Sequence, residues 1–181
     1  VNKGGTVLIE SSTLSGNYTF YNGGGIASQS LSGLATAYLT VKNSTISGNV
    51  SENLGGGIES SGSSTLNNVT ITDNIASVGG GVYGSASISN TILAGNTANI
   101  SGSDCDGSLS SLGHNLIEDT SACTISGDTT TNITGISPNL GILADNGGPT
   151  ETHAFMDGSP TENSGSPELT GSPESACEEN D

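Results

Sequence analysis

Apolar and polar residues alternate along several short runs of the chain. The runs at 39–41 (Leu-Thr-Val) and 70–72 (Thr-Ile-Thr) show this alternation clearly. A period of two places successive side chains on opposite faces and is typical of a half-buried β-strand. Good helix formers at the spacing of an amphipathic helix do not recur. The pattern therefore predicts an all-β chain built from brief strands.

One phrase of the sequence occurs four times with small changes. It reads SSTLSGNYTFYNGGGI at 11–26, NSTISGNVSENLGGGI at 43–58, NVTITDNIASVGGGV at 68–82 and, in part, NTILAGN at 90–96. The aligned columns are Ile9, Val41, Leu66 and Ile88; Leu14, Ile46, Ile71 and Leu93; and Asn17, Asn49, Asn74 and Asn96. The asparagines are 32, 25 and 22 residues apart, so insertions occur at one place in each repeat.

A unit of this length cannot bury its apolar side alone. If successive units coil into a β-solenoid, each lies about 4.8 Å above the last and pairs its backbone with its neighbours. Equivalent residues then stack, so Ile, Val and Leu fill a narrow core and inward-facing asparagines form a ladder of side-chain amides. Glycine triplets at 23–25, 55–57 and 79–81 provide turns. We expect a single parallel β-helix over residues 1–156.

The composition fits a thin core and limits the partners. The chain has 28 Gly, two Phe, four Tyr and no Trp, too few large side chains for a compact helical core. Eighteen acids against Lys3 and Lys42 give a net charge of −16, which excludes nucleic acid and anionic membrane surfaces as partners. No run of about 20 apolar residues could span a bilayer. The lack of an initiator methionine and of a signal peptide indicates a portion of a longer precursor.

The recurring [ST]-[ILV]-x-[GD]-N followed by GGG[IV] resembles the right-handed parallel β-helix repeats of bacterial surface proteins, including polymorphic outer-membrane proteins with their GGA[IV] and FxxN words. A later stretch is similar to the closing segment of that secreted class. It comprises NTILAGN, Asp104-Cys105-Asp106-Gly107, LGHNLI at 112–117, Cys123 and SPNLGILADNGGPTETHA at 137–154. The resemblance covers residues 4–158. After Gly158 the family usually continues GSPAID-x-G, whereas this chain reads GSPTENSGSPELTGSPESACEEND.

The resemblance implies a right-handed β-helix at the cell surface or outside the cell. It also implies a disulfide between Cys105 and Cys123, which leaves Cys177 as an odd thiol. The family names an architecture and a location, not a reaction. We therefore expect an extracellular structural or adhesive module that is not an enzyme and has no cofactor or metal. Its expected partners are further copies of itself or the glycans and proteins of a cell surface.

A carbohydrate-active enzyme is the alternative in another class, because polysaccharide lyases and glycoside hydrolases share this architecture. Lyase chemistry needs a basic residue for proton abstraction, and this chain has no Arg. Hydrolases need two carboxylates facing each other across a sugar. The close acidic pairs, which we expect to be solvated loop acids, are Asp104 with Asp106 and Glu118 with Asp119. His114 and His153 are expected to be structural residues of the closing segment.

Three kinds of binding surface are further alternatives. A glycan-binding face is one, although few aromatic side chains are available to stack on sugars. Calcium-binding repeats would need an aspartate after each glycine triplet. The residues in that position are Ala27, Glu59 and Tyr83. An ice-binding face would need ranks of threonine, but the only such column reads Thr13, Thr45, Thr70 and Ile92.

Six N-x-[ST] sequons occur, a number that the Ser and Thr content makes unsurprising. Asn17 and Asn49 belong to the expected asparagine ladder and should face inward, where no glycan fits. Asn99 and Asn132 look exposed and are the candidates for glycosylation.

The two ends of the chain differ in character. Residues 157–181 carry seven acids and three of the five prolines, a composition typical of a flexible linker. At the start, Val1–Gly5 provides no cap for the strand at 7–9. Either preceding repeats were removed with the precursor, or another molecule stacks there in a head-to-tail contact that propagates into a fibre. Such assembly should become easier as salt or Ca²⁺ rises, because the chains repel one another.

Overall fold

The computed structural model describes residues 1–30 and 35–165, and the fold in this part of the chain is all-β with parallel sheets. Cys177 and the rest of the acidic segment from residue 166 onward lie outside the described residues. The described residues form no α-helix, and so none that could cross a bilayer.

Most of the strands are short, as expected for repeated units. The strands are β1 (Gly5–Glu10), β2 (Thr13–Ser15), β3 (Tyr18–Thr19), β4 (Ile26–Ser28), β5 (Ala37–Ser47), β6 (Val50–Ser51), β7 (Ile58–Ser60), β8 (Ser63–Thr72), β9 (Ile75–Val78), β10 (Val82–Ser89), β11 (Ile92–Ala94), β12 (Thr97–Ser101), β13 (Cys105–Leu112), β14 (Leu116–Ile117), β15 (Cys123–Asp128), β16 (Ile133–Thr134), β17 (Leu140–Ala144) and β18 (Thr152–Phe155). They form a 12-stranded sheet, a 4-stranded sheet (β12-β9-β6-β3) and a 2-stranded hairpin (β17-β18).

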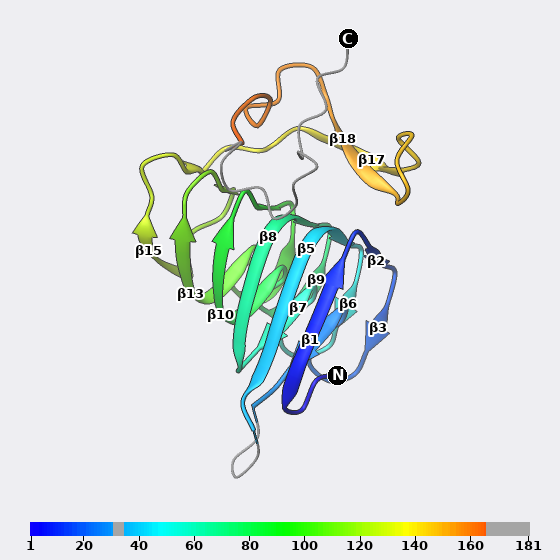
Figure 1. Ribbon diagram of the computed structural model, residues 1–181, viewed down its shortest axis with the longest axis vertical. Coiled ribbons are helices and arrows are strands. Elements are labelled where there is room, and N and C mark those ends of the chain that lie inside the picture. The colour runs from blue at the N-terminus through cyan, green and yellow to red at the C-terminus, as the bar shows by residue number, and fades with distance from the viewer. Residues whose placement is uncertain (31–34, 166–181) are drawn as a thin grey trace.

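Each repeat pairs in parallel with the equivalent part of the next repeat. In the large sheet, β1 pairs with β5, β5 with β8, β8 with β10, β10 with β13 and β13 with β15, side by side in Figure 1. This register confirms the apolar columns expected from the sequence. The columns are Ile9, Val41, Leu66 and Ile88, and Leu14, Ile46, Ile71 and Leu93.

A residue in the left-handed backbone region marks a corner in each repeat. Asn43 and Asn68 have φ of 47° and 59°, and the pairing of β5 with β8 skips both of them. Asparagine tolerates this region better than other non-glycine residues, which explains its frequency there. The equivalent residues, all with positive φ, are Ser11, Asn43, Asn68, Asn90 and His114. The corner turns the chain from one stretch of the large sheet into the next.

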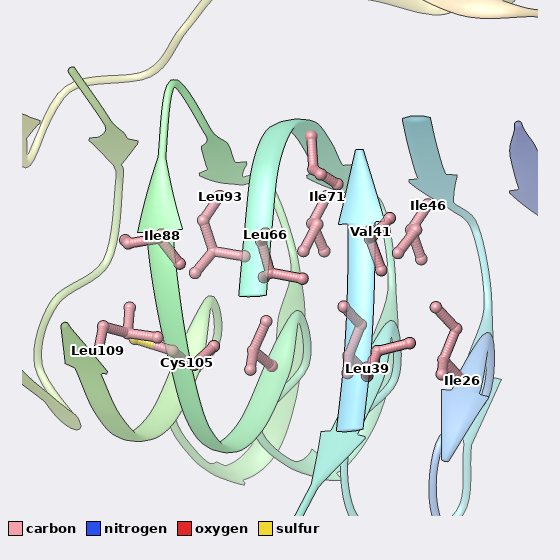
Figure 2. Close-up of a cluster of buried hydrophobic side chains, with 14 of the residues drawn as sticks. Ile26, Leu39, Val41, Ile46, Leu66, Ile71, Ile88, Leu93, Cys105 and Leu109 are labelled. Atoms are coloured by element: carbon pink, nitrogen blue, oxygen red, sulfur yellow. The ribbon is translucent and has the colours of Figure 1, made fainter. Parts of the chain in front are cut away.

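The core is a set of stacked aliphatic side chains between these stretches. Figure 2 shows Val41, Leu66 and Ile88 pointing toward the row that contains Ile46, Ile71 and Leu93. These six side chains are 0–1% exposed. Burial of one such side chain contributes about 1.5–3 kcal/mol, so the columns account for much of the stability of the stack.

The antiparallel hairpin β17-β18 folds back over the repeats. The Thr13 hydroxyl donates a hydrogen bond of 2.6 Å to the carbonyl of Glu151, 138 residues away in the sequence. Beside it, Leu140 and Ile133 pack against a small cluster that includes Ile92. The threonine column considered for ice binding is therefore partly covered, and Thr45 is 5% exposed.

Residues just beyond the boundary expected at 156 also contact the closing segment. The Ser159 hydroxyl donates to the carbonyl of Pro138 at 2.6 Å, and Asn139 Nδ2 donates to the carbonyl of Asp157 at 3.0 Å. Ser159 and Thr161 are only 6% and 8% exposed. Residues 157–165 thus contact the closing segment, because their hydroxyl groups satisfy one another and nearby carbonyls.

Candidate functional site

Four asparagines form a continuous hydrogen-bonded column inside the stack. The Oδ1 atom of Asn74 accepts two bonds from Asn49, from the backbone N–H at 3.0 Å and from Nδ2 at 2.9 Å. The Asn74 side chain and backbone donate in the same way to Oδ1 of Asn96, and those of Asn17 donate to Asn49. One carbonyl oxygen in each repeat thus satisfies two donors of the preceding repeat. We call this set the asparagine column: Asn17, Asn49, Asn74 and Asn96.

The second hydrogen of each interior amide is also used. Asn74 Nδ2 donates to the carbonyl of Ile46, and Asn96 Nδ2 to that of Ile71, both at 2.9 Å. Asn49 and Asn74 are fully buried, so their amides would be costly to leave unpaired. Asn17 faces the column, since it donates to Asn49, but it is exposed in the first repeat. Its Oδ1 has no donor from a preceding repeat within the described chain.

Asp104 closes the asparagine column at its other end. Its Oδ1 accepts from the backbone N–H of Asn96 at 3.1 Å and from Asn96 Nδ2 at 2.9 Å, which is the pattern made by each asparagine. Its Oδ2 accepts from the backbone N–H of Asp119 at 2.7 Å. Asp104 is 1% exposed. The expectation that Asp104 is a solvated loop acid is therefore wrong, since three donors hold the carboxylate inside the fold.

A signal for Asp104 was present in the sequence. Residues 102–105 (Gly-Ser-Asp-Cys) occupy the place of the Gly-Gly-Gly-apolar words, because Val82 pairs with Cys105. A Cβ on Gly81 would lie 2.9 Å from Nδ2 of Asn96 and 2.4 Å from the carbonyl oxygen of Asp104. The third glycine of each triplet has no room for a side chain where an asparagine of the next repeat lies against it. The asparagine column does not continue past residues 102–105, so the third position there can be aspartate. The Asp104 carboxylate then accepts the hydrogen bonds of Asn96.

A second pair of asparagines repeats this arrangement in the closing segment. Oδ1 of Asn132 accepts from the backbone N–H of Asn115 at 3.1 Å, and Oδ1 of Asn115 accepts from the backbone N–H of Thr91 at 3.0 Å. Asn132 is half-buried, and its Nδ2 donates to the Ser111 hydroxyl at 3.0 Å. The structure therefore corrects the expectation that Asn132 is exposed. Asn99 is exposed, and its glycosylation stays a prediction.

Cys105 and Cys123 form a disulfide that joins β13 to β15. Their Cα atoms are 5.6 Å apart. Cys105 stands in the apolar column of Ile58 and Val82 and is 1% exposed. The disulfide thus ties the repeat that contains Asp104 to the strand that follows it.

His153 links the hairpin to the repeats. Its Nδ1 lies 2.8 Å from the carbonyl oxygen of Gly141, and its Nε2 lies 2.9 Å from the hydroxyl of Ser47. Since a carbonyl only accepts, Nδ1 carries a proton, and in the neutral tautomer of that kind Nε2 accepts from Ser47. This serine–histidine pair has the polarity of a catalytic dyad, but Ser47 is 3% exposed. His114 occupies the corner column, with Nδ1 2.8 Å from the carbonyl oxygen of Ser164.

The acids of the closing segment are bound to backbone groups. Glu118 Oε2 accepts from the N–H of Gly95 at 3.0 Å, and Asp119 Oδ1 accepts from the N–H of Ser121 at 2.9 Å. A cavity of about 170 Å³ between the repeats and the hairpin is lined by Asp73, Glu118 and His153 among others. Ligand pockets usually measure about 300–1,000 Å³, so this cavity is small for a sugar chain.

The positions considered for calcium fall where the alignment placed them. Glu59 lies opposite Ala27 in one neighbouring strand and Tyr83 in the other. In the part of the chain that the structure describes, no three His, Cys, Asp or Glu side chains are grouped to hold a metal ion. Comparison of the chain with protein-family models, curated proteins and solved structures gave no match.

Replacement of Asn74 by alanine tests the asparagine column. Asn74→Ala removes the acceptor for two donors of Asn49 and the donor to Asn96, so we expect a loss of about 1–3 kcal/mol in the free energy of unfolding. Urea or thermal unfolding measures it. Asn17→Ala is the matched control, and its effect should be smaller because that side chain is exposed. Equal effects of the two substitutions would contradict a buried network.

Two buried carboxyl groups should make stability depend on pH. Burial raises the pKa of Asp104 despite its hydrogen bonds from Asn96 and Asp119. Burial likewise raises the pKa of Glu59, whose Oε2 has no hydrogen-bond partner among the described residues. Each group therefore binds a proton more readily in the folded state. The free energy of unfolding should rise as the pH falls through the interval between the raised and the ordinary pKa.

Melting temperatures measured from about pH 8 to about pH 5 test this effect. We expect the melting temperature to rise toward the lower pH, and the rise to be smaller in a Glu59→Gln, Asp104→Asn double variant. Glu10→Gln, at an exposed position of β1, controls for the change in net charge. The range stops above the ordinary pKa of aspartate. Hydrogen bonds lower the pKa of Asp119 and Asp128, so at lower pH their protonation would decrease the free energy of unfolding and oppose the effect. A melting temperature that falls throughout this range would refute the assignment.

Proposed function

We propose that this chain is a right-handed parallel β-helix that acts as an extracellular structural and adhesive module. The asparagine column with Asp104 as its end carries the proposal. The buried amides of Asn49, Asn74 and Asn96 hold one repeat to the next, and their hydrogen bonds are complete. Chemistry on a substrate would need such groups to be accessible, so the outer faces are the surfaces that contact partners.

The order of the repeats supports the β-helix. Each repeat pairs in parallel with the next through two apolar columns and one asparagine column, and the corners recur at equivalent residues. The resemblance of the GGG[IV] words and of the closing segment to secreted β-helix proteins favours the right-handed form.

The extracellular location rests on two features of the chain. Disulfides such as Cys105–Cys123 persist mainly in oxidising compartments. The net charge of −16 keeps the protein away from nucleic acids and anionic lipids. Both features are those expected of a module that faces the medium or another surface.

Binding of the protein to a surface without formation of a reaction product tests the proposed function. The purified chain is applied to immobilised cell-envelope material and to a panel of neutral and uronic-acid polysaccharides, and bound protein is measured together with reducing ends and unsaturated products. We expect retention on at least one surface with no product. A heat-unfolded sample controls for non-specific adsorption.

The remaining outcomes of that experiment separate the alternatives. Release of reducing ends or unsaturated products would replace the proposal with a glycoside hydrolase or a lyase. Loss of retention on every surface would remove the adhesive role. Retention of the unfolded sample to the same degree would also contradict it.

End-to-end assembly is part of the same proposal. Among the described residues, β1 and β15 are the outermost strands of the main face of the large sheet, and strand edges without a neighbour favour pairing with another chain. Because the molecules repel one another, assembly should increase as NaCl is raised from low to about physiological strength, where the screening length is about 8 Å. Light scattering and negative-stain microscopy measure it. A chain that stays monomeric at high concentration and high salt would rule the fibre out.

A further inference from the structure

Three exposed aromatic residues lie close together in the sequence of the first repeat. Tyr18, Phe20 and Tyr21 are 53%, 73% and 80% exposed. They are half of the Phe and Tyr residues of a chain that has no Trp. The rings of Tyr18 and Phe20 meet edge to face, with centroids 5.1 Å apart. Few aromatic side chains are available to stack on sugars, but these three occur together at one corner, which we call the aromatic cluster.

Hydrogen bonds hold the aromatic cluster in place. The Tyr18 hydroxyl donates to Glu52 Oε1 at 2.8 Å, and the Ser51 hydroxyl donates to the carbonyl of Tyr21 at 2.6 Å. The backbone N–H of Tyr21 donates to the hydroxyl of Thr19 at 3.1 Å. Because the bond to Glu52 holds the Tyr18 ring before any ligand arrives, a ligand would lose little affinity to the ordering of that ring.

The cluster lies on the outer face of the 4-stranded sheet. Asn17 joins the internal column and Tyr18 follows it, so Tyr18 points outward. Tyr18 pairs with Val50, which pairs with Ile75, itself 42% exposed. This places an apolar strip beside the rings, across successive repeats about 4.8 Å apart.

Polar groups border the rings. Glu52 keeps lone pairs beyond the one used by Tyr18, since a carboxylate accepts about four bonds. Close by, Asn53 Nδ2 donates to Asn22 Oδ1 at 2.8 Å, which leaves further donors and acceptors on both amides. Aromatic faces with adjoining carboxylate and amide groups match a sugar ring, which has an apolar C–H face and a rim of hydroxyls.

The negative charge of the protein favours neutral sugars over acidic ones. The chain carries −16, and Glu52 adds a carboxylate within the cluster itself. Uronic-acid or sulfated polymers would be repelled, and neither Lys3 nor Lys42 forms part of the cluster. The three rings expose roughly 400 Å², from their fractional exposure and a typical 150–250 Å² per aromatic side chain. This is about half of what each partner buries in a standard protein interface, so a single sugar chain is the better fit.

We propose that the aromatic cluster of Tyr18, Phe20 and Tyr21, with Glu52 at its edge, is a binding site for a neutral polysaccharide. This inference rests on the adhesive role proposed above and names the ligand class for it. Sugar rings stack on the exposed aromatic faces, and the hydroxyl rim bonds to Glu52 and the neighbouring amides.

Affinity electrophoresis in native gels tests the site, because the strong negative charge gives the protein high mobility. Gels contain a neutral β-glucan, a neutral mannan or polygalacturonate. We expect at least one neutral polymer to retard the chain and polygalacturonate to leave it free. Tyr21→Ala should weaken retardation about tenfold, and the Tyr18→Ala, Phe20→Ala, Tyr21→Ala triple variant should abolish it.

Two control variants keep the test specific. Tyr38→Ala removes a tyrosine of similar exposure, 51%, from β5 in the large sheet, and it should bind like the parent. Tyr18→Phe keeps the ring and removes the bond to Glu52, so it should retain most of the binding. Melting temperatures of all variants show whether the fold is kept.

Other results would overturn the site. They are retardation by polygalacturonate alone, unchanged binding of a folded triple variant, or equal losses for Tyr38→Ala. A parent that sediments as a dimer and a triple variant that sediments as a monomer would assign the cluster to self-contact instead. If envelope retention persists in the triple variant, the adhesive role stands and this site fails; if the parent is not retained at all, the adhesive role fails with it.

Discussion

The requirement that every buried amide find a partner in the next repeat governs this molecule. A buried, unpaired polar group costs about 1–3 kcal/mol, a large fraction of the stability of a typical domain. Asn49 and Asn74 avoid this cost only because an asparagine or its equivalent stands at the same place in the following repeat. The aliphatic side chains alone would tolerate a slip of two residues between neighbouring strands, since inward positions such as Leu39 and Val41 are both aliphatic. The amides do not, and they fix the register.

A column of this kind has to end, and the chain ends it by several means in the same region. Asp104 supplies an acceptor in place of a further asparagine. The Cys105–Cys123 disulfide fixes the adjoining strands, and Asp119 donates its backbone N–H to the same carboxylate. The β17-β18 hairpin then returns to the first repeats, where Thr13 and Ser47 meet Glu151 and His153. The closing segment therefore acts on both the last and the first part of the stack.

The interior side chains hold the repeats together, so differences in binding depend on the surface. Inward positions are held by stacking, so variation is easiest at outward positions and in the insertions between repeats. The aromatic cluster lies at such outward positions, beside β3 and β6. It differs from the part of the large sheet where small hydroxyl side chains such as Ser63, Ser85 and Ser108 are exposed.

The sequence by itself determined the strand type, the apolar columns and the members of the asparagine column. Each of these depends on residues that pair with copies of themselves, so the repeat in the sequence is the repeat in space. The location of Asp104 could also have been read from the Gly-Ser-Asp-Cys word, had it been aligned with the glycine triplets. Only the tertiary structure decided that Asn132 joins a second pair of asparagines and that Thr45 is covered. These features depend on contacts made once, between non-repeating segments up to 138 residues apart, and no periodicity in a sequence reports such contacts.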